Sequence, residues 1–96
     1  MITAKFYEYH DQICIDIDGD SEELHDFNAV LKKTLQDELL KFSDSCGGIC
    51  ESTDSLYIEV TPYDDEARAD INRLLNVYIN IYTELEEQFP EYIKIE

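Results

Sequence analysis

The sequence predicts an α+β fold, a two-layer α/β sandwich in which two helices pack on one face of a sheet. Short segments alternate apolar and polar residues, as strands with one wet face do, and two longer segments repeat apolar residues every three or four positions, as helices do. The expected order of elements is β-β-α-β-β-α-β. The 96 residues suffice for a single domain, 1–96, with a modest core.

The longest helical pattern lies in the last third of the chain. Its apolar residues fall on one face of a helix: Ala67, Ile71, Leu74, Leu75, Tyr78, Tyr82, Leu85 and Phe89. Val77 and Ile81 make this face wider than the seam of a coiled coil, so we expect a sheet to cover it. Four residues of this face are expected to be buried: Leu74, Leu75, Tyr78 and Leu85.

Proline and capping residues mark both ends of this helix. Thr61 suits the N-cap, Pro62 suits the first helical position, and the acidic residues at 64–66 favour the positive end of the helix dipole. Pro90 ends the helix, because a residue before proline avoids the helical conformation. The alternation over 92–96 then predicts an edge strand.

The first half of the chain predicts a β-hairpin followed by a helix. Ile2–Tyr7 and Ile13–Asp18 alternate in polarity on either side of a polar turn at 9–12. Asp20–Glu23 resembles a capping box, in which Asp20 accepts from the backbone and Glu23 reaches back. A helix of about five turns is then expected from its apolar residues: Leu24, Phe27, Leu31, Leu35, Leu39 and Phe42.

The middle of the chain carries weaker signals. The small and polar residues over 43–48 are expected to break the first helix. A weak strand is expected at 49–52 and a turn at 53–55. Residues 56–60 alternate clearly and predict a further strand.

Charge limits the classes of partner. With 23 acidic and 7 basic residues, the formal net charge is −16, which argues against direct binding of nucleic acid or an anionic membrane. It permits a basic protein partner, or mimicry of nucleic acid in another protein's basic groove. The acidic residues gather at the end of the hairpin and the start of the first helix, where we expect a basic polypeptide to bind: Asp16, Asp18, Asp20, Glu22, Glu23 and Asp26. The alternative is an acidic surface that serves only solubility.

Targeting signals and metal motifs are not apparent in the sequence. The first residues lack the apolar run of a signal peptide, and three cysteines without an export signal suggest reduced thiols in a cytoplasm. Cys46 and Cys50 have no second pair with which to hold zinc, and the acidic cluster lacks the ligand order of an EF-hand. We therefore expect no metal and no cofactor.

The order of elements and the ending Leu74–Ile95 resemble the ribosomal-processing cysteine protease family, called Prp. Its members often close on a helix followed by a short strand like Pro90-Glu-Tyr-Ile93, and the opening hairpin from Ile2 to Gly19 is also similar. The resemblance implies a protein that trims the N-terminal extension of a bacterial large-subunit ribosomal protein with a His–Cys dyad. It also implies a homodimer.

Both dyad positions depart from the family pattern. The family has Gly-His-Ala at the end of the second strand, whereas Gly19 is followed here by Asp20. The family cysteine should fall within Phe27–Ala29, where the sequence Asp26-Phe-Asn-Ala-Val30 offers none. An aspartate at the histidine position would raise a thiol's pKa by repulsion, so we expect no catalytic residue at these positions.

Three functions follow as hypotheses. The first is a catalytically degenerate Prp-like protein that binds a basic partner, such as a ribosomal protein. The second is an active cysteine protease with a rearranged site, in which His25 approaches Cys14 in space. The third is an acidic inhibitor or nucleic-acid mimic.

Overall fold

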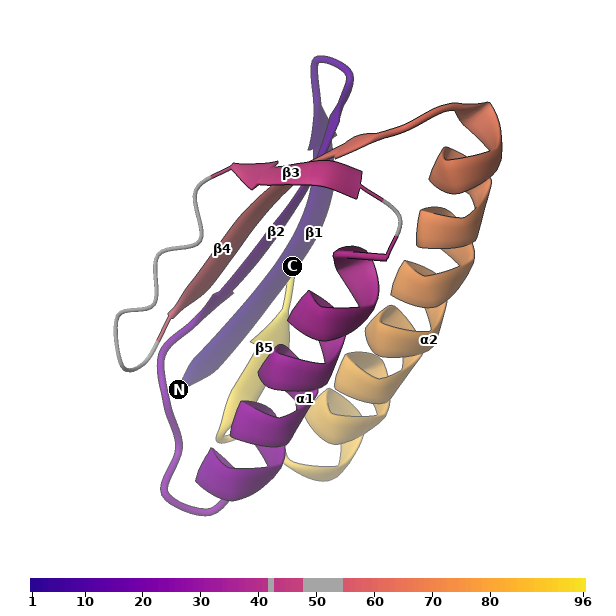
Figure 1. Ribbon diagram of the computed structural model, residues 1–96. Helices are drawn as coiled ribbons and strands as arrows, with labels where there is room; N and C mark the ends of the chain where they lie inside the picture. The colour runs from indigo at the N-terminus through magenta and orange to yellow at the C-terminus, as the bar shows by residue number, and fades with distance from the viewer. Residues whose placement is uncertain (42, 48–54) are drawn as a thin grey trace.

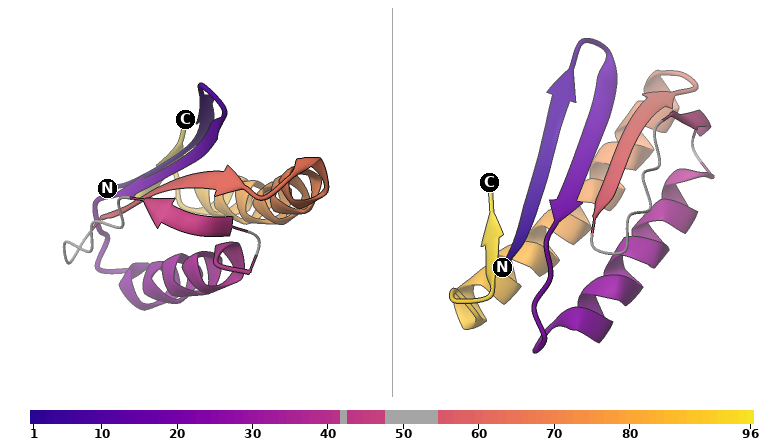
Figure 2. Two further views of the ribbon diagram at one scale, coloured as in Figure 1. Left: turned by 45° about the horizontal axis from the view of Figure 1, so that its top comes forward. Right: turned by 90° about the vertical axis from the view of Figure 1, so that its left-hand side faces the viewer.

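The computed structural model of the protein describes residues 1–41, 43–47 and 55–96. These residues form two layers, with the helices side by side on one face of a five-stranded sheet (Figures 1 and 2). The strands are β1 (Ile2–Tyr9), β2 (Gln12–Asp18), β3 (Ser43–Gly47), β4 (Leu56–Pro62) and β5 (Ile93–Ile95), and the helices are α1 (His25–Leu39) and α2 (Asp65–Gln88). The predicted α+β class is confirmed.

The sheet has the strand order β3-β4-β2-β1-β5. β2 is antiparallel to β1 and to β4, β3 is antiparallel to β4, and β5 is parallel to β1. The tight turn of the β1–β2 hairpin places His10 at a φ of 54°, in the left-handed region. Gly19, at a φ of 84°, follows β2, and a Cβ there would clash with the carbonyl oxygen of Met1.

Strand alternation divides the sheet into a covered face and an open face. Ile13, Ile15 and Ile17 of β2 lie in the core beneath the helices, while Cys14 and Asp16 face the other way. β1 and β4 add further apolar residues to the covered face: Ile2, Ala4, Leu56, Ile58 and Val60. The period of two in the sequence therefore places the core correctly.

The helix α2 follows its predicted apolar face, with one exception. Leu75 and Tyr78 are buried, and Leu74 and Leu85 are half-buried against the same core. Val77 is 55% exposed, so the expectation that the sheet covers it is wrong. Its position on α2 faces the outer side of the helical layer instead. Ile81 is half-buried.

The start of α2 lies later than predicted. Thr61 and Pro62 belong to β4, and the N-cap is Asp64, whose carboxylate accepts a 2.8 Å hydrogen bond from the Ala67 N–H. The prediction for Thr61 and Pro62 was wrong because a strand continued through them. The helix ends at Gln88, just before Pro90, as predicted.

The start of α1 also differs from the prediction. The helix begins at His25 after Leu24, and no side chain caps it. Asp20 and Glu23 do not form a capping box, because a turn closed by the Leu24 N–H and the Ser21 carbonyl separates them from the helix. Asn28 is only 3% exposed, whereas Phe27 is 50% exposed, so the buried face of α1 passes through Asn28.

Between the helices, the structure has a strand that the sequence pattern did not predict. Ser43–Gly47, expected only to break the first helix, forms β3 at the edge of the sheet, with an irregular register against β4. The weak strand predicted at 49–52 lies outside the described residues, as does Phe42.

Candidate functional site

The six acidic residues singled out in the sequence are divided among three places in the structure. Asp20, Glu22 and Asp26, together with His25, line an open depression of about 430 Å³ at the start of α1. Asp16 and Asp18 extend from the open face of the sheet at the end of β2. Glu23 is not among the residues that line the depression, and its carboxylate accepts a 3.0 Å hydrogen bond from the Ser21 hydroxyl.

Asp20 and His25 form an ion-pair geometry at the depression. Nδ1 of His25 donates to Oδ2 of Asp20 at 2.8 Å, and the same carboxylate accepts from the Ser21 N–H at 2.8 Å. The hydrogen bond from His25 holds the pKa of Asp20 below its usual range. Asp20 therefore stays ionised, and the depression keeps a negative charge.

Asp16 has a different electrostatic setting. Burial raises its pKa, the nearby Asp18 charge raises it further, and Lys5 opposes both. Asp18, at the strand end, accepts a hydrogen bond from the Ser55 hydroxyl. A cationic group that approached these two carboxylates would relieve their mutual repulsion.

The open face of the sheet carries a polar row across three strands. The register aligns Tyr7, Cys14 and Glu59, and the Tyr57 hydroxyl donates to Glu59 at 2.7 Å. Hydrogen bonding to Glu59, and then to Tyr7, raises the pKa of Tyr57. Cys14 is only 1% exposed within this row, so its thiol is closed to solvent.

The candidate dyad of Cys14 and His25 is not brought together. Cys14 lies on the open face, whereas His25 is engaged with Asp20 at the start of α1 on the covered side. The other histidine, His10, lies in the hairpin turn with its ring 4.3 Å from that of Tyr9. Within the described residues, no group of His, Cys, Asp and Glu has the arrangement of a metal site.

Two further hollows lie outside the acidic cluster. A groove of about 410 Å³ between α1 and α2 is lined mainly by apolar side chains, among them Phe27, Val77 and Ile81. The other hollow, of about 360 Å³, lies between β1 and α2. The sequence analysis did not predict this groove. The unusually wide apolar face of the second helix, which includes Val77 and Ile81, could have indicated it.

No protein-family model matches the sequence, and no curated protein matches it. The resemblance to the Prp family therefore stays a prediction. No helix among the described residues is long and apolar enough to cross a membrane.

Proposed function

We propose that this protein is a non-catalytic, Prp-like binding protein that holds a basic polypeptide at its acidic end, defined as Asp16, Asp18, Asp20, Glu22 and Asp26. One observation carries the proposal: Asp20, Glu22 and Asp26 share one open depression, and Asp16 and Asp18 lie on the adjoining strand. Carboxylates in such a cluster attract lysine and arginine side chains. The formal net charge of −16 adds a long-range attraction.

The residues at the family's dyad positions support binding without catalysis. Asp20 is engaged with His25, and Asn28 is buried with its side chain directed to Tyr82. Phe27 is exposed beside the groove between the helices. Neither a nucleophile nor a base occupies these positions, whereas an acidic surface is sufficient for binding.

The resemblance suggests the identity of the basic partner. A cationic extension of a ribosomal protein fits the acidic end by charge, and we propose such a segment as the ligand. Direct contact with nucleic acid or a membrane is not part of the proposal, because both are polyanionic. Action in the cytoplasm, where ribosomal proteins are made, follows from the same proposal.

Binding of a synthetic ribosomal extension peptide tests the proposal. The triple variant Asp18→Asn, Asp20→Asn and Glu22→Gln should weaken the affinity by about tenfold, and raising salt from about 50 to 300 mM should weaken it further. The matched control replaces three exposed acids on and after α2, Glu84, Glu87 and Glu91, by Gln, which changes the net charge equally. Equal weakening by both triple variants would show that only the total charge matters.

We also propose a homodimer through the groove between α1 and α2. Phe27 and Val77 are half exposed at this groove, and burying such apolar area favours association. Because two copies repel each other, salt should strengthen the dimer while it weakens binding of the basic partner. In sedimentation experiments, Val77→Lys should give monomers, and Val30→Lys, on an exposed α1 position outside the groove lining, should not.

A further inference from the structure

One edge of the sheet is only partly occupied. β1 pairs with β2 from Thr3 to Tyr9, but on its other side β5 pairs only with Ile2–Ala4. Figure 2 shows the short β5 beside the first part of β1. Within the part of the chain that the structure describes, residues 5–9 therefore have no neighbouring strand on that side.

The backbone groups at this edge can be assigned from the hydrogen bonds of β5. The Ile2 N–H donates to the Tyr92 carbonyl at 2.8 Å, and the Ala4 carbonyl accepts from the Glu96 N–H at 2.9 Å. Backbone direction alternates along a strand, so the N–H and C=O groups of Phe6 and Glu8 face the same edge beyond β5. An added strand could pair with these groups.

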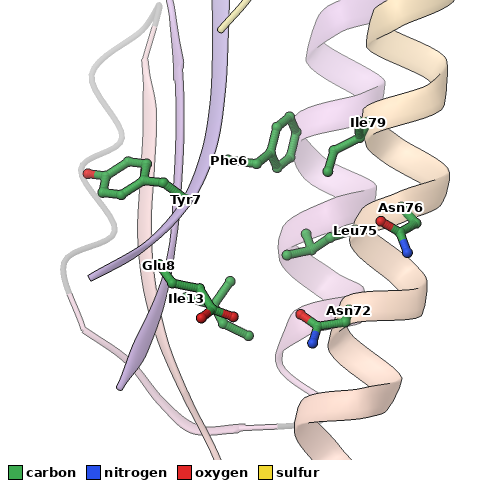
Figure 3. A pocket seen from close by; sticks show the side chains of 8 residues that line it. All are labelled: Phe6, Tyr7, Glu8, Ile13, Asn72, Leu75, Asn76 and Ile79. Atoms are coloured by element: carbon green, nitrogen blue, oxygen red, sulfur yellow. The ribbon is translucent and has the colours of Figure 1, made fainter. Parts of the chain in front are cut away.

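A cavity of about 360 Å³ lies directly beside this edge, between β1 and α2. Figure 3 shows Phe6 and Ile79 pointing toward one another across it, while Tyr7 points to the opposite side of β1. Leu75 and Ile13 continue its apolar lining. The exposed amides of Asn72 and Asn76, one helical turn apart on α2, add hydrogen-bonding groups.

We propose that the β1 edge, residues 5–9, binds an extended segment of a basic polypeptide as an added strand, with one apolar side chain in the cavity. Main-chain pairing would give affinity, and the pocket for one side chain would give specificity. The β1 edge does not use the carboxylates of the acidic end. Experiments can therefore refute binding at one of these two sites without refuting binding at the other.

Charge decides between a basic segment and a second copy of this chain. The formal net charge of −16 opposes pairing of two identical edges. At the cavity, the exposed carboxylate of Glu8 forms a long ion pair with Nη1 of Arg68, 3.7 Å away, and stays open to a second cation. A lysine or arginine two residues from the inserted apolar side chain lies on the same face of the added strand and can approach Glu8.

The test uses a capped peptide with the repeat Lys-Thr-Val-Thr, in which lysine and valine alternate along one face of the added strand, and the same peptide with N-methyl groups on alternate residues. Methylation removes the donors of one edge but keeps the charge, so it separates strand pairing from general attraction. The alternating peptide should bind at about 150 mM salt and slow hydrogen exchange at the Phe6 and Glu8 N–H groups by about tenfold. The methylated peptide should do neither.

Two variants of α2 test the cavity. Ile79→Lys introduces a charge into it and should weaken binding of the alternating peptide by about tenfold. Ile81→Lys is the matched control: Ile81 is also half-buried on α2 but lines the groove between the helices, so affinity should change less than about twofold. If Ile79→Lys unfolds the domain, Asn76→Leu, at an exposed position of the same cavity, should still alter affinity.

Three outcomes would overturn the proposal. The first is equal affinity for the methylated and unmethylated peptides, and the second is binding without protection of Phe6 and Glu8. The third is concentration-dependent protection of these two groups in the protein alone, which would assign the edge to a second copy. Unchanged affinity of the ribosomal extension peptide for the Asp18, Asp20 and Glu22 triple variant, with protection at Phe6 retained on the alternating peptide, would refute only the acidic end.

Discussion

The hydroxyl of Tyr82 on α2 donates a 2.8 Å hydrogen bond to Oδ1 of Asn28 on α1, and both residues are buried. The bond links the two helices through their side chains. Buried polar groups that are mutually satisfied specify how two elements align, because any other alignment leaves them unpaired. This pair therefore fixes the position of α1 on α2.

Tyr82→Phe removes the donor and leaves the Asn28 amide buried without its partner. We expect a loss of about 1–3 kcal/mol in the free energy of unfolding, measured by urea denaturation. Replacing both residues, with Asn28→Leu and Tyr82→Phe, should cost less than the sum of the single changes, because no polar group is left unsatisfied. Additive losses would show that the two side chains act independently.

Stability should decline at alkaline pH because of buried and hydrogen-bonded tyrosines. Burial raises the pKa of Tyr82, and hydrogen bonds to Glu59 and Tyr7 raise that of Tyr57. In the unfolded chain both phenols ionise near about pH 10, while the folded protein retains the protons. The contribution of these two protonated phenols to the free energy of unfolding is complete below about pH 10 and is lost as the pH rises above it. The urea midpoint should fall over this range, and Tyr82→Phe should flatten the decline.

Asp16→Asn should stabilise the protein at neutral pH. Burial, and then the Asp18 charge, raise the pKa of Asp16 above its unfolded value of 3.8, so its ionised form is disfavoured in the fold. The destabilisation by ionised Asp16 is absent below pH 3.8, where the carboxyl is protonated in both the folded and the unfolded chain. It appears as the pH rises through the pKa of Asp16 in the folded protein. The variant's urea midpoint should exceed the wild type's at about pH 7 and match it near about pH 3.

Asp20→Asn is a control for which the opposite change in stability is expected. The hydrogen bond from His25 lowers the pKa of Asp20, so this carboxylate stabilises the fold above pH 3.8 and loses that effect as the pH falls. The variant should therefore be less stable than the wild type at neutral pH. If the urea midpoint at neutral pH changed in the same direction for both variants, the opposite pKa shifts of Asp16 and Asp20 would be contradicted.

The apolar patterns predicted most of the fold because they depend on neighbouring residues. The hairpin, β4 and the face of α2 each repeat with the period of their own element. The choice of Asn28 over Phe27 for the buried face of α1 could not be predicted in this way, since its partner Tyr82 lies 54 residues away. β3 could not be predicted either, because Ser43–Gly47 lacks β-branched and aromatic residues and gains its pairing from β4.

Leu75→Ala should destabilise the domain by about 2–5 kcal/mol, since it opens a cavity beneath α2. Val77→Ala, on the same helix but exposed, should change the free energy of unfolding by less than about 0.5 kcal/mol. Chemical denaturation of both variants measures the difference. Similar losses for the two would mean that Val77 is covered, as in a stable homodimer.

Cys14 should not support proteolysis. Its side chain is closed to solvent between Tyr7 and Glu59, and its cross-strand neighbours include no histidine. Incubation with a ribosomal extension peptide should leave the peptide intact, as read by mass spectrometry, and alkylation of Cys14 should be slow until urea unfolds the protein. Specific cleavage that Cys14→Ser abolishes would contradict this expectation.

The candidate site was predicted only in outline. The sequence placed the acidic residues near one another, and Asp20, Glu22 and Asp26 do share a depression. It could not show that Glu23 turns to Ser21, because the turn before α1 replaced the expected capping box. Nor could it show the open edge of β1, which depends on where a distant strand stops.

The parallel pairing of Ile2 with Ile93 has a consequence for synthesis of the protein. Among the described elements, β1 is translated before the others and β5 after them, so the edge that β5 covers is bare while the chain between them is translated. At about 5–20 residues per second, that interval lasts about 5–20 seconds. Pairing of such distant segments is also intrinsically slow. Completion of the sheet is thus a late event, and the speed of translation sets how long a nascent β1 is open to pairing with another nascent chain.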